Sequence, residues 1–83
     1  MEQSEEIITS LKREYSFCSN ALAFYKKTLK DFERKYKLTT GTFLKKFEAG
    51  QLGDEADYFD WYAFAKLFDR AQKTKSAIRS ALQ

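Results

Sequence analysis

The chain has 83 residues, of which 17% are aromatic, and a formal net charge of +3. At this length we expect a single domain over residues 1–83, with a core that is only marginally sufficient unless a second chain contributes to it. The sequence has no run of about eighteen uncharged apolar residues, no basic leader before an apolar stretch and only one cysteine, so it predicts a cytoplasmic protein without membrane association or an internal disulfide.

The first predicted helix covers residues 4–37. The chain has no proline, and its three glycines all fall between residues 41 and 53, so the earlier segment is free to be helical. Apolar residues recur there at alternating intervals of three and four, a heptad seam that indicates a long amphipathic helix. Ser4, followed by Glu5 and Glu6, suits its start, because a hydroxyl can cap a helix and carboxylates complement its dipole. The seam consists of Ile8, Leu11, Tyr15, Cys18, Leu22, Tyr25, Leu29, Phe32 and Tyr36.

A second apolar stripe lies beside the middle of this seam. Phe17, Ala21 and Phe24 have the spacing of one helix face and adjoin the seam at Cys18 and Tyr25. A hairpin partner would bury the seam, and a further element must bury the stripe. One solution is a two-fold homodimer that forms a four-helix bundle. The alternative is that a short helix of the same chain folds back over Phe17 and Phe24.

A short second helix is predicted over residues 41–49. Thr39 or Thr40 can cap its start, and Gly50 can end it in a left-handed conformation. Its apolar face contains Phe43, Leu44 and Phe47.

The third predicted helix covers residues 55–81. Asp54, with Asp57 three residues later, forms a capping-box-like start. Between Tyr58 and Phe68 the apolar and aromatic residues go round most of the helix, which predicts that several neighbours enclose it. The fold is therefore expected to be all-α, a long antiparallel hairpin with a short connecting helix that dimerises into a bundle. The predicted partner or dimer interface consists of Phe17, Phe24, Tyr62, Phe64 and Phe68.

The stretch between the two long helices resembles a pattern found in small prokaryotic all-helical proteins. These proteins, antitoxin-like or uncharacterised and encoded near small toxins, share a Phe-x-x-x-Phe-x-x-Gly-x-Leu-Gly-Asp run followed by acidic residues and a tryptophan. The resemblance covers residues 38–68 and implies a shared structural corner in a protein that neutralises a partner. The matching residues are Phe43, Phe47, Gly50, Leu52, Gly53, Asp54 and Trp61.

Residues suited to catalysis or metal binding are few. The chain has no histidine, so the commonest general base and imidazole ligand are missing. Cys18 falls on the seam, where a thiol behaves as a small hydrophobe. The acidic residues between Glu48 and Asp60 lack the alternating ligand pattern of a calcium loop. We therefore expect no enzyme activity, cofactor or metal, and a module that acts by binding another protein.

The first helix also carries a basic face. Lys27, Lys30, Arg34 and Lys37 recur at helical spacing opposite the seam. Such a ridge can contact phosphates, so weak binding of nucleic acid is the alternative function. A solvated outer helix face explains the same pattern.

Overall fold

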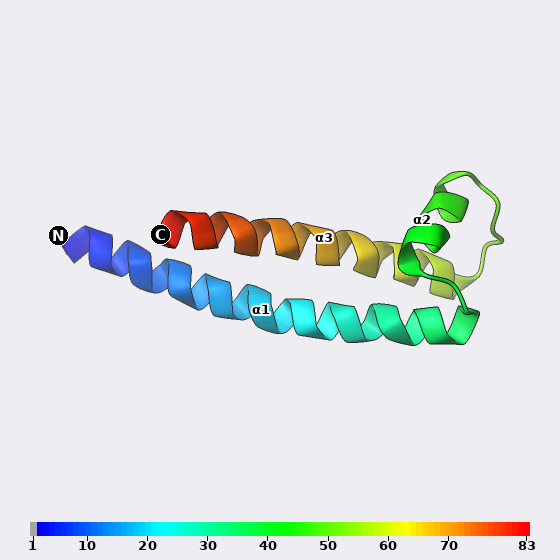
Figure 1. Cartoon of the computed structure of the whole chain (residues 1–83), viewed down its shortest axis with the longest axis horizontal. Coiled ribbons are helices and arrows are strands. Elements are labelled where there is room, and N and C mark those ends of the chain that lie inside the picture. Colours follow the sequence, from blue (N-terminus) through cyan, green and yellow to red (C-terminus); the bar gives the residue numbers. More distant parts are fainter. Residues whose placement is uncertain (1) are drawn as a thin grey trace.

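The computed structural model describes residues 2–83, with side chains from Glu5 onward, and this part of the chain forms three helices. These are α1 (Glu2–Tyr36), α2 (Thr40–Glu48) and α3 (Ala56–Leu82). The two long helices lie side by side in opposite directions, and α2 sits at the end where the chain reverses (Figure 1). The predicted all-α hairpin with a short connecting helix is confirmed, whereas its pairing with a second copy remains a prediction.

The seam of α1 packs along α3, but not over its full length. Cys18 and Leu29 are buried, whereas Ile8 near the start of α1 is 44% exposed. The reason is length: α1 has 35 residues and α3 has 27. The first turns of α1 project beyond the end of α3 (Figure 1). The helix begins at Glu2, two residues before the predicted start at Ser4.

Two hydrogen bonds fix the start of α2, one accepted by a residue of α1 and one by a residue of the turn that follows α1. Thr39 is the N-cap, and its Oγ1 accepts a hydrogen bond of 3.2 Å from the backbone N–H of Thr42. The carboxylate of Glu33 accepts another, of 2.7 Å, from the N–H of Thr40. The sequence left Thr39 and Thr40 as alternatives for the cap, and the structure selects Thr39.

Positive φ angles occur at two points around α2 in the described chain. Gly50 has a φ of 71° directly after α2, as the sequence predicts, and Lys37 has a φ of 55° directly after α1. Gly53, in the same turn, does not have a positive φ. The turn that follows α2 therefore relies on Gly50 for its left-handed residue.

The start of α3 differs from the predicted capping box. The N-cap is Glu55, which makes no side-chain capping hydrogen bond, and Asp54 is an exposed residue outside the helix. Asp57 does not reach back to Asp54. Its carboxylate instead binds residues of α1, because the antiparallel arrangement brings the end of α1 beside the start of α3.

The core of the molecule sits at the corner between the three helices. Trp61 and Phe43 are fully buried, and their rings stack in parallel with centroids 3.9 Å apart. Phe32 and Tyr36 of α1 stack on Trp61 with centroids 5.6 and 5.8 Å from it. Leu29 and Ala65 complete the buried cluster. These aromatic contacts fix the position of α2 against both long helices.

Candidate functional site

Two phenylalanines on α1 remain exposed although they are large and apolar. Phe17 is 68% exposed and Phe24 is 59% exposed. Phe24 contacts Phe64 of α3 edge to face, with centroids 6.1 Å apart, so the apolar surface continues from one long helix to the other. We call this surface the central strip, and it consists of Phe17, Ala21, Phe24, Phe64 and Leu67.

The short helix α2 does not cover the central strip. Phe47 of α2 stacks on Tyr62 with centroids 5.0 Å apart, and Tyr62 precedes Phe64 by two residues on the same helix. Residues two apart on a helix point to nearly opposite sides. The strip and α2 therefore lie on different sides of α3. Of the two ways to bury Phe17 and Phe24, folding back of the short helix is not the one that the structure uses.

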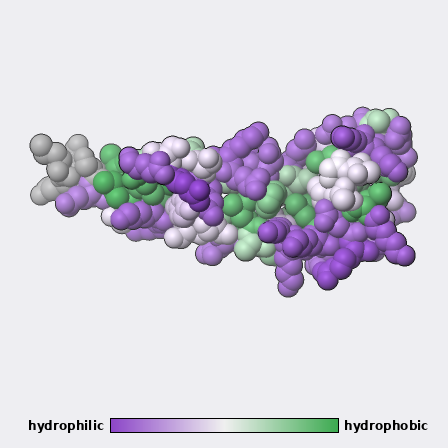
Figure 2. All heavy atoms as spheres, viewed as in Figure 1, coloured by the Kyte–Doolittle hydropathy of each residue, from purple (hydrophilic) through white to green (hydrophobic). Residues whose placement is uncertain are grey.

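The five residues predicted for the interface fall into two groups. Phe17, Phe24 and Phe64 share the central strip. Tyr62 stacks on α2, and Phe68 lines a groove of about 330 Å³ with Leu44 of α2. Apolar residues gather in separate patches on the face shown in Figure 2, near the start of α1, halfway along the hairpin and around α2. The surface is thus divided between apolar patches and the polar side chains that separate them.

The predicted corner residues also separate into buried and exposed members. Phe43 and Trp61 form the core, and Phe47 and Leu52 pack against it. Gly50 supplies the turn, whereas Gly53 and Asp54 are exposed and lie outside the helices. The aromatic rings of the corner pack against one another in the core. None of them is therefore fully exposed for contact with a ligand.

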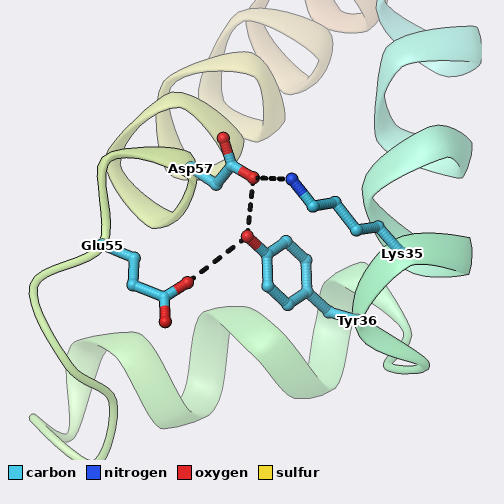
Figure 3. A network of polar contacts seen from close by, with 4 residues as sticks. All are labelled: Lys35, Tyr36, Glu55 and Asp57. Atoms are coloured by element: carbon cyan, nitrogen blue, oxygen red, sulfur yellow. Dashed lines mark hydrogen bonds and ion pairs between the residues drawn. The ribbon is translucent and has the colours of Figure 1, made fainter.

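A polar network that the sequence analysis missed ties α1 to the start of α3 (Figure 3). The Asp57 Oδ2 accepts hydrogen bonds of 2.6 Å from the Lys35 ammonium and of 2.6 Å from the Tyr36 hydroxyl. The Glu55 carboxylate lies 3.4 Å from the same hydroxyl. The sequence predicted both acidic residues only as part of a helix start. Each lies 19 to 22 residues from its partner on α1, so no local sequence pattern indicates these contacts.

The network shifts the pKa of each of its central groups. Hydrogen bonds from Lys35 and then Tyr36 lower the pKa of Asp57 below its ordinary value of 3.8. The hydrogen bond to Asp57 raises the pKa of Lys35 and also that of Tyr36. Each group is therefore held more firmly in the form it has at neutral pH, an ionised Asp57 between a cation and a neutral phenol. This arrangement clamps two helices together and offers no group poised for proton transfer near pH 7.

A second polar contact joins the long helices near their free ends. The Arg79 guanidinium donates a hydrogen bond of 3.0 Å to the Tyr15 hydroxyl, and the Lys75 ammonium lies 5.1 Å from the centre of the Tyr15 ring. The hydrogen bond from Arg79 lowers the pKa of Tyr15. These contacts close the part of the hairpin that lacks the aromatic core.

The remaining candidates for chemistry are a thiol and carboxylates. Cys18 is 5% exposed, and its Sγ lies 4.0 Å from the Glu14 carboxylate. Among the side chains from Glu5 onward, no three acidic or thiol groups lie close enough together to hold a metal ion.

The basic face of α1 is exposed to solvent. Lys27, Lys30, Arg34 and Lys37 all have exposed side chains, and Arg34 pairs with Asp31 on the same helix. Lys30, Arg34 and Lys37 also border a shallow groove of about 510 Å³ near the turn into α2. The structure thus brings three of the four predicted residues to one groove.

No protein-family model, curated protein or solved structure matches the chain. The resemblance of the corner residues to antitoxin-like proteins therefore stays a prediction. Among the helices of residues 2–83, none has both the length and the apolar character required for a membrane span.

Proposed function

We propose that the protein is a non-enzymatic interaction module that binds protein through the central strip. The observation that carries this proposal is the exposure of Phe17 and Phe24, next to Phe64, on one side of the hairpin. Single exposed apolar residues are common, but contiguous aromatic surface of this kind is typical of binding sites. All five residues of the strip are apolar, so the strip itself carries no nucleophile or proton carrier.

The proposal includes a homodimer in the cytoplasm. Two hairpins that meet through their strips would form a four-helix bundle, in which Phe17 and Phe24 become buried. The free thiol of Cys18 is compatible with a reducing compartment.

The corner motif supports a more specific version of this function. By its resemblance to antitoxin-like proteins, we propose that the module neutralises a protein partner by covering its working surface. The test is purification of the tagged chain from its native host, followed by an assay of the co-purified protein with and without the module. A partner that is toxic alone and inactive in the complex supports neutralisation, and a partner whose activity is unchanged contradicts it.

The strip is tested by substituting both exposed rings. The double variant Phe17→Glu and Phe24→Glu places two carboxylates on the strip, where burial of unpaired charge opposes association. A matched control, Ser16→Glu and Ala23→Glu, adds the same charge one residue earlier at exposed positions outside the strip. We expect circular dichroism to show equal helix content for both.

Sedimentation equilibrium and capture assays then decide the proposal. The strip variant is expected to sediment as one chain and to lose its partners, whereas the control keeps the association of the native protein. If the strip variant associates as strongly as the control, the central strip is not the binding surface.

Binding of nucleic acid by the basic face is the second candidate, favoured by the groove that Lys30, Arg34 and Lys37 share. Contacts between lysines and phosphates release counterions, so affinity is highest at low salt. Titration of labelled duplex DNA and RNA at about 50 mM salt tests this candidate. Binding that weakens steeply with salt, and that weakens in Lys30→Gln with Lys37→Gln, supports it. Undetectable binding at low salt excludes it.

A further inference from the structure

The midpoint between the two exposed rings of α1 falls within two residues of the middle of that helix. Phe17 and Phe24 stand at equal distances from the point between Asn20 and Ala21, and α1 runs from Glu2 to Tyr36. A second α1 that crosses this point in the opposite direction therefore overlaps the first along nearly its whole length. In that arrangement, Phe17 of each copy lies beside Phe24 of the other. Asn20 and Ala21 at the crossing point have short side chains, which allow close approach of the two helices.

The charge distribution of α1 favours the same direction. The described side chains of its first turns begin with Glu5 and Glu6, whereas its last three turns are strongly basic. A parallel pair would place the two basic ends together, and an antiparallel pair places each acidic start beside a basic end. The basic residues of those last turns are Lys26, Lys27, Lys30, Arg34 and Lys35, against the acidic Asp31 and Glu33.

The neighbouring helix adds to this surface without obstructing it. Phe64 touches Phe24 on the inner edge of the strip, and Leu67, one turn along α3, is 39% exposed. A second copy that covers Phe24 therefore also reaches apolar atoms of α3. The second copy then buries apolar residues of both α1 and α3, so that both long helices take part in the contact, as in a four-helix bundle.

We propose that the occupant of the central strip is a second copy of this chain, packed with its α1 antiparallel to the first and with the two-fold axis between Asn20 and Ala21. This arrangement rests on the proposed function, because it uses the same strip. It adds the direction and the register of the proposed homodimer. It also leaves the groove beside α2 outside the interface, where a further partner has access to it.

Cysteine cross-linking tests the direction and the register. In a Cys18→Ala background, Ser10→Cys and Asp31→Cys introduce single thiols at exposed positions that stand at equal distances from the proposed axis. The two thiols of different copies lie side by side in an antiparallel pair. Two copies of the same thiol lie about 32 Å apart along the helix, from a separation of 21 residues at a rise of 1.5 Å.

A short bismaleimide linker is then applied to each variant alone and to an equimolar mixture. We expect linked dimers in the mixture at a yield at least tenfold above that of either variant alone. A third variant, Asn20→Cys, has its thiol close to the axis and is expected to link with itself. Circular dichroism of every variant verifies that the helices are intact.

Each other outcome has a distinct meaning. Strong self-linking of Ser10→Cys shows a parallel pair, which overturns this arrangement while the strip remains an interface. Failure of all three thiols to link, in a chain that sediments as a dimer sensitive to the two phenylalanine substitutions, overturns the register. A native chain that sediments as a monomer overturns the second copy. Binding of another protein through the strip would then still stand or fall by the substitution of Phe17 and Phe24.

Discussion

The indole N–H of Trp61 on α3 donates a hydrogen bond of 3.1 Å to the Oγ1 of Thr40 in the first turn of α2. The same indole ring is fully buried against Phe43 on α2 and stacks on Phe32 of α1. One side chain thus joins all three helices by ring stacking and by a polar bond. The position of α2 consequently depends more on Trp61 than on any local property of its nine residues.

Substitution of Trp61 is expected to destabilise the fold severely. Trp61→Ala removes the stacking partner of three aromatic rings and leaves a cavity, so we expect a loss of about 3 to 5 kcal/mol in the free energy of unfolding. Thr40→Val retains the shape of the side chain but removes the acceptor of the indole N–H, at an expected cost of about 1 to 3 kcal/mol. Urea denaturation followed by circular dichroism measures both. An unchanged free energy of unfolding for Trp61→Ala would contradict its place in the core.

The glycines of the reversal allow a matched pair of substitutions. Gly50 has a φ of 71°, and a Cβ built there meets no atom within 4 Å, so Gly50→Ala introduces backbone strain without a clash. The expected cost is about 1 to 2 kcal/mol, the penalty of a left-handed residue with a side chain. Gly53→Ala is the control, because its site is equally open and its φ is not in the left-handed region.

In the control Gly53→Ala, alanine reduces the conformational freedom of the unfolded chain. We therefore expect its free energy of unfolding to stay equal to that of the native protein or to rise by up to about 1 kcal/mol. Thermal denaturation of the two variants under the same conditions gives the comparison. Equal destabilisation by both substitutions would show that strain at Gly50 does not distinguish the two glycines.

The Asp57 clamp predicts a dependence of stability on acid. Because the folded chain lowers the pKa of Asp57, its contribution is present above the ordinary pKa of 3.8 and is lost as the pH falls through the lower folded value. We expect the melting temperature of the native protein to decline between about pH 5 and about pH 2, and Asp57→Asn to decline less over that range. At neutral pH the variant is expected to be the less stable of the two.

Asp60→Asn serves as the control for this experiment, since it removes an exposed carboxylate from the same helix without touching Lys35 or Tyr36. The melting temperature of Asp60→Asn is expected to fall between neutral and acidic pH by as much as that of the native protein. Parallel melting curves for Asp57→Asn and the native protein across the acidic range would refute the clamp as a source of this dependence.

The sequence predicts the hairpin well because its signals are local and periodic. The heptad seam of α1 has nine apolar positions at regular spacing, and the three glycines mark where the chain reverses. The exposed pair Phe17 and Phe24 also follows from periodicity, because the two rings lie outside the seam. These features depend on the geometry of a single helix, which sequence spacing determines directly.

Contacts between helices were harder to predict. Asp57 has a local explanation as a capping residue, but in the structure Lys35 and Tyr36 compete for it and prevail. Glu33 likewise reads as a solvated residue of a charged helix, although its carboxylate binds the N–H of Thr40. Both pairings require the rotation of one helix about its axis relative to another, a quantity that tertiary packing sets and that residue spacing does not contain.

The unequal distribution of the core predicts an uneven resistance to local unfolding. Leu29, Phe43, Trp61 and Ala65 form the buried cluster at the corner, whereas the rest of the hairpin has Cys18 and Ile78 as its buried apolar residues among those described. Local opening needs less free energy where fewer apolar contacts must break. Amide hydrogen exchange is therefore expected to be slowest in residues 29–36 and 58–68 and fastest in the first turns of α1.

The same measurement also reports on the central strip. If Phe17 and Phe24 are covered by a second copy, the amides of residues 17–24 gain protection as the protein concentration rises, because association stabilises the bound form by mass action. In the Phe17→Glu and Phe24→Glu variant this gain is expected to disappear, while the protection of residues 58–68 stays unchanged. Loss of protection at both places would mean that the two rings stabilise the hairpin itself, and slow exchange in the first turns of α1 would contradict the predicted gradient.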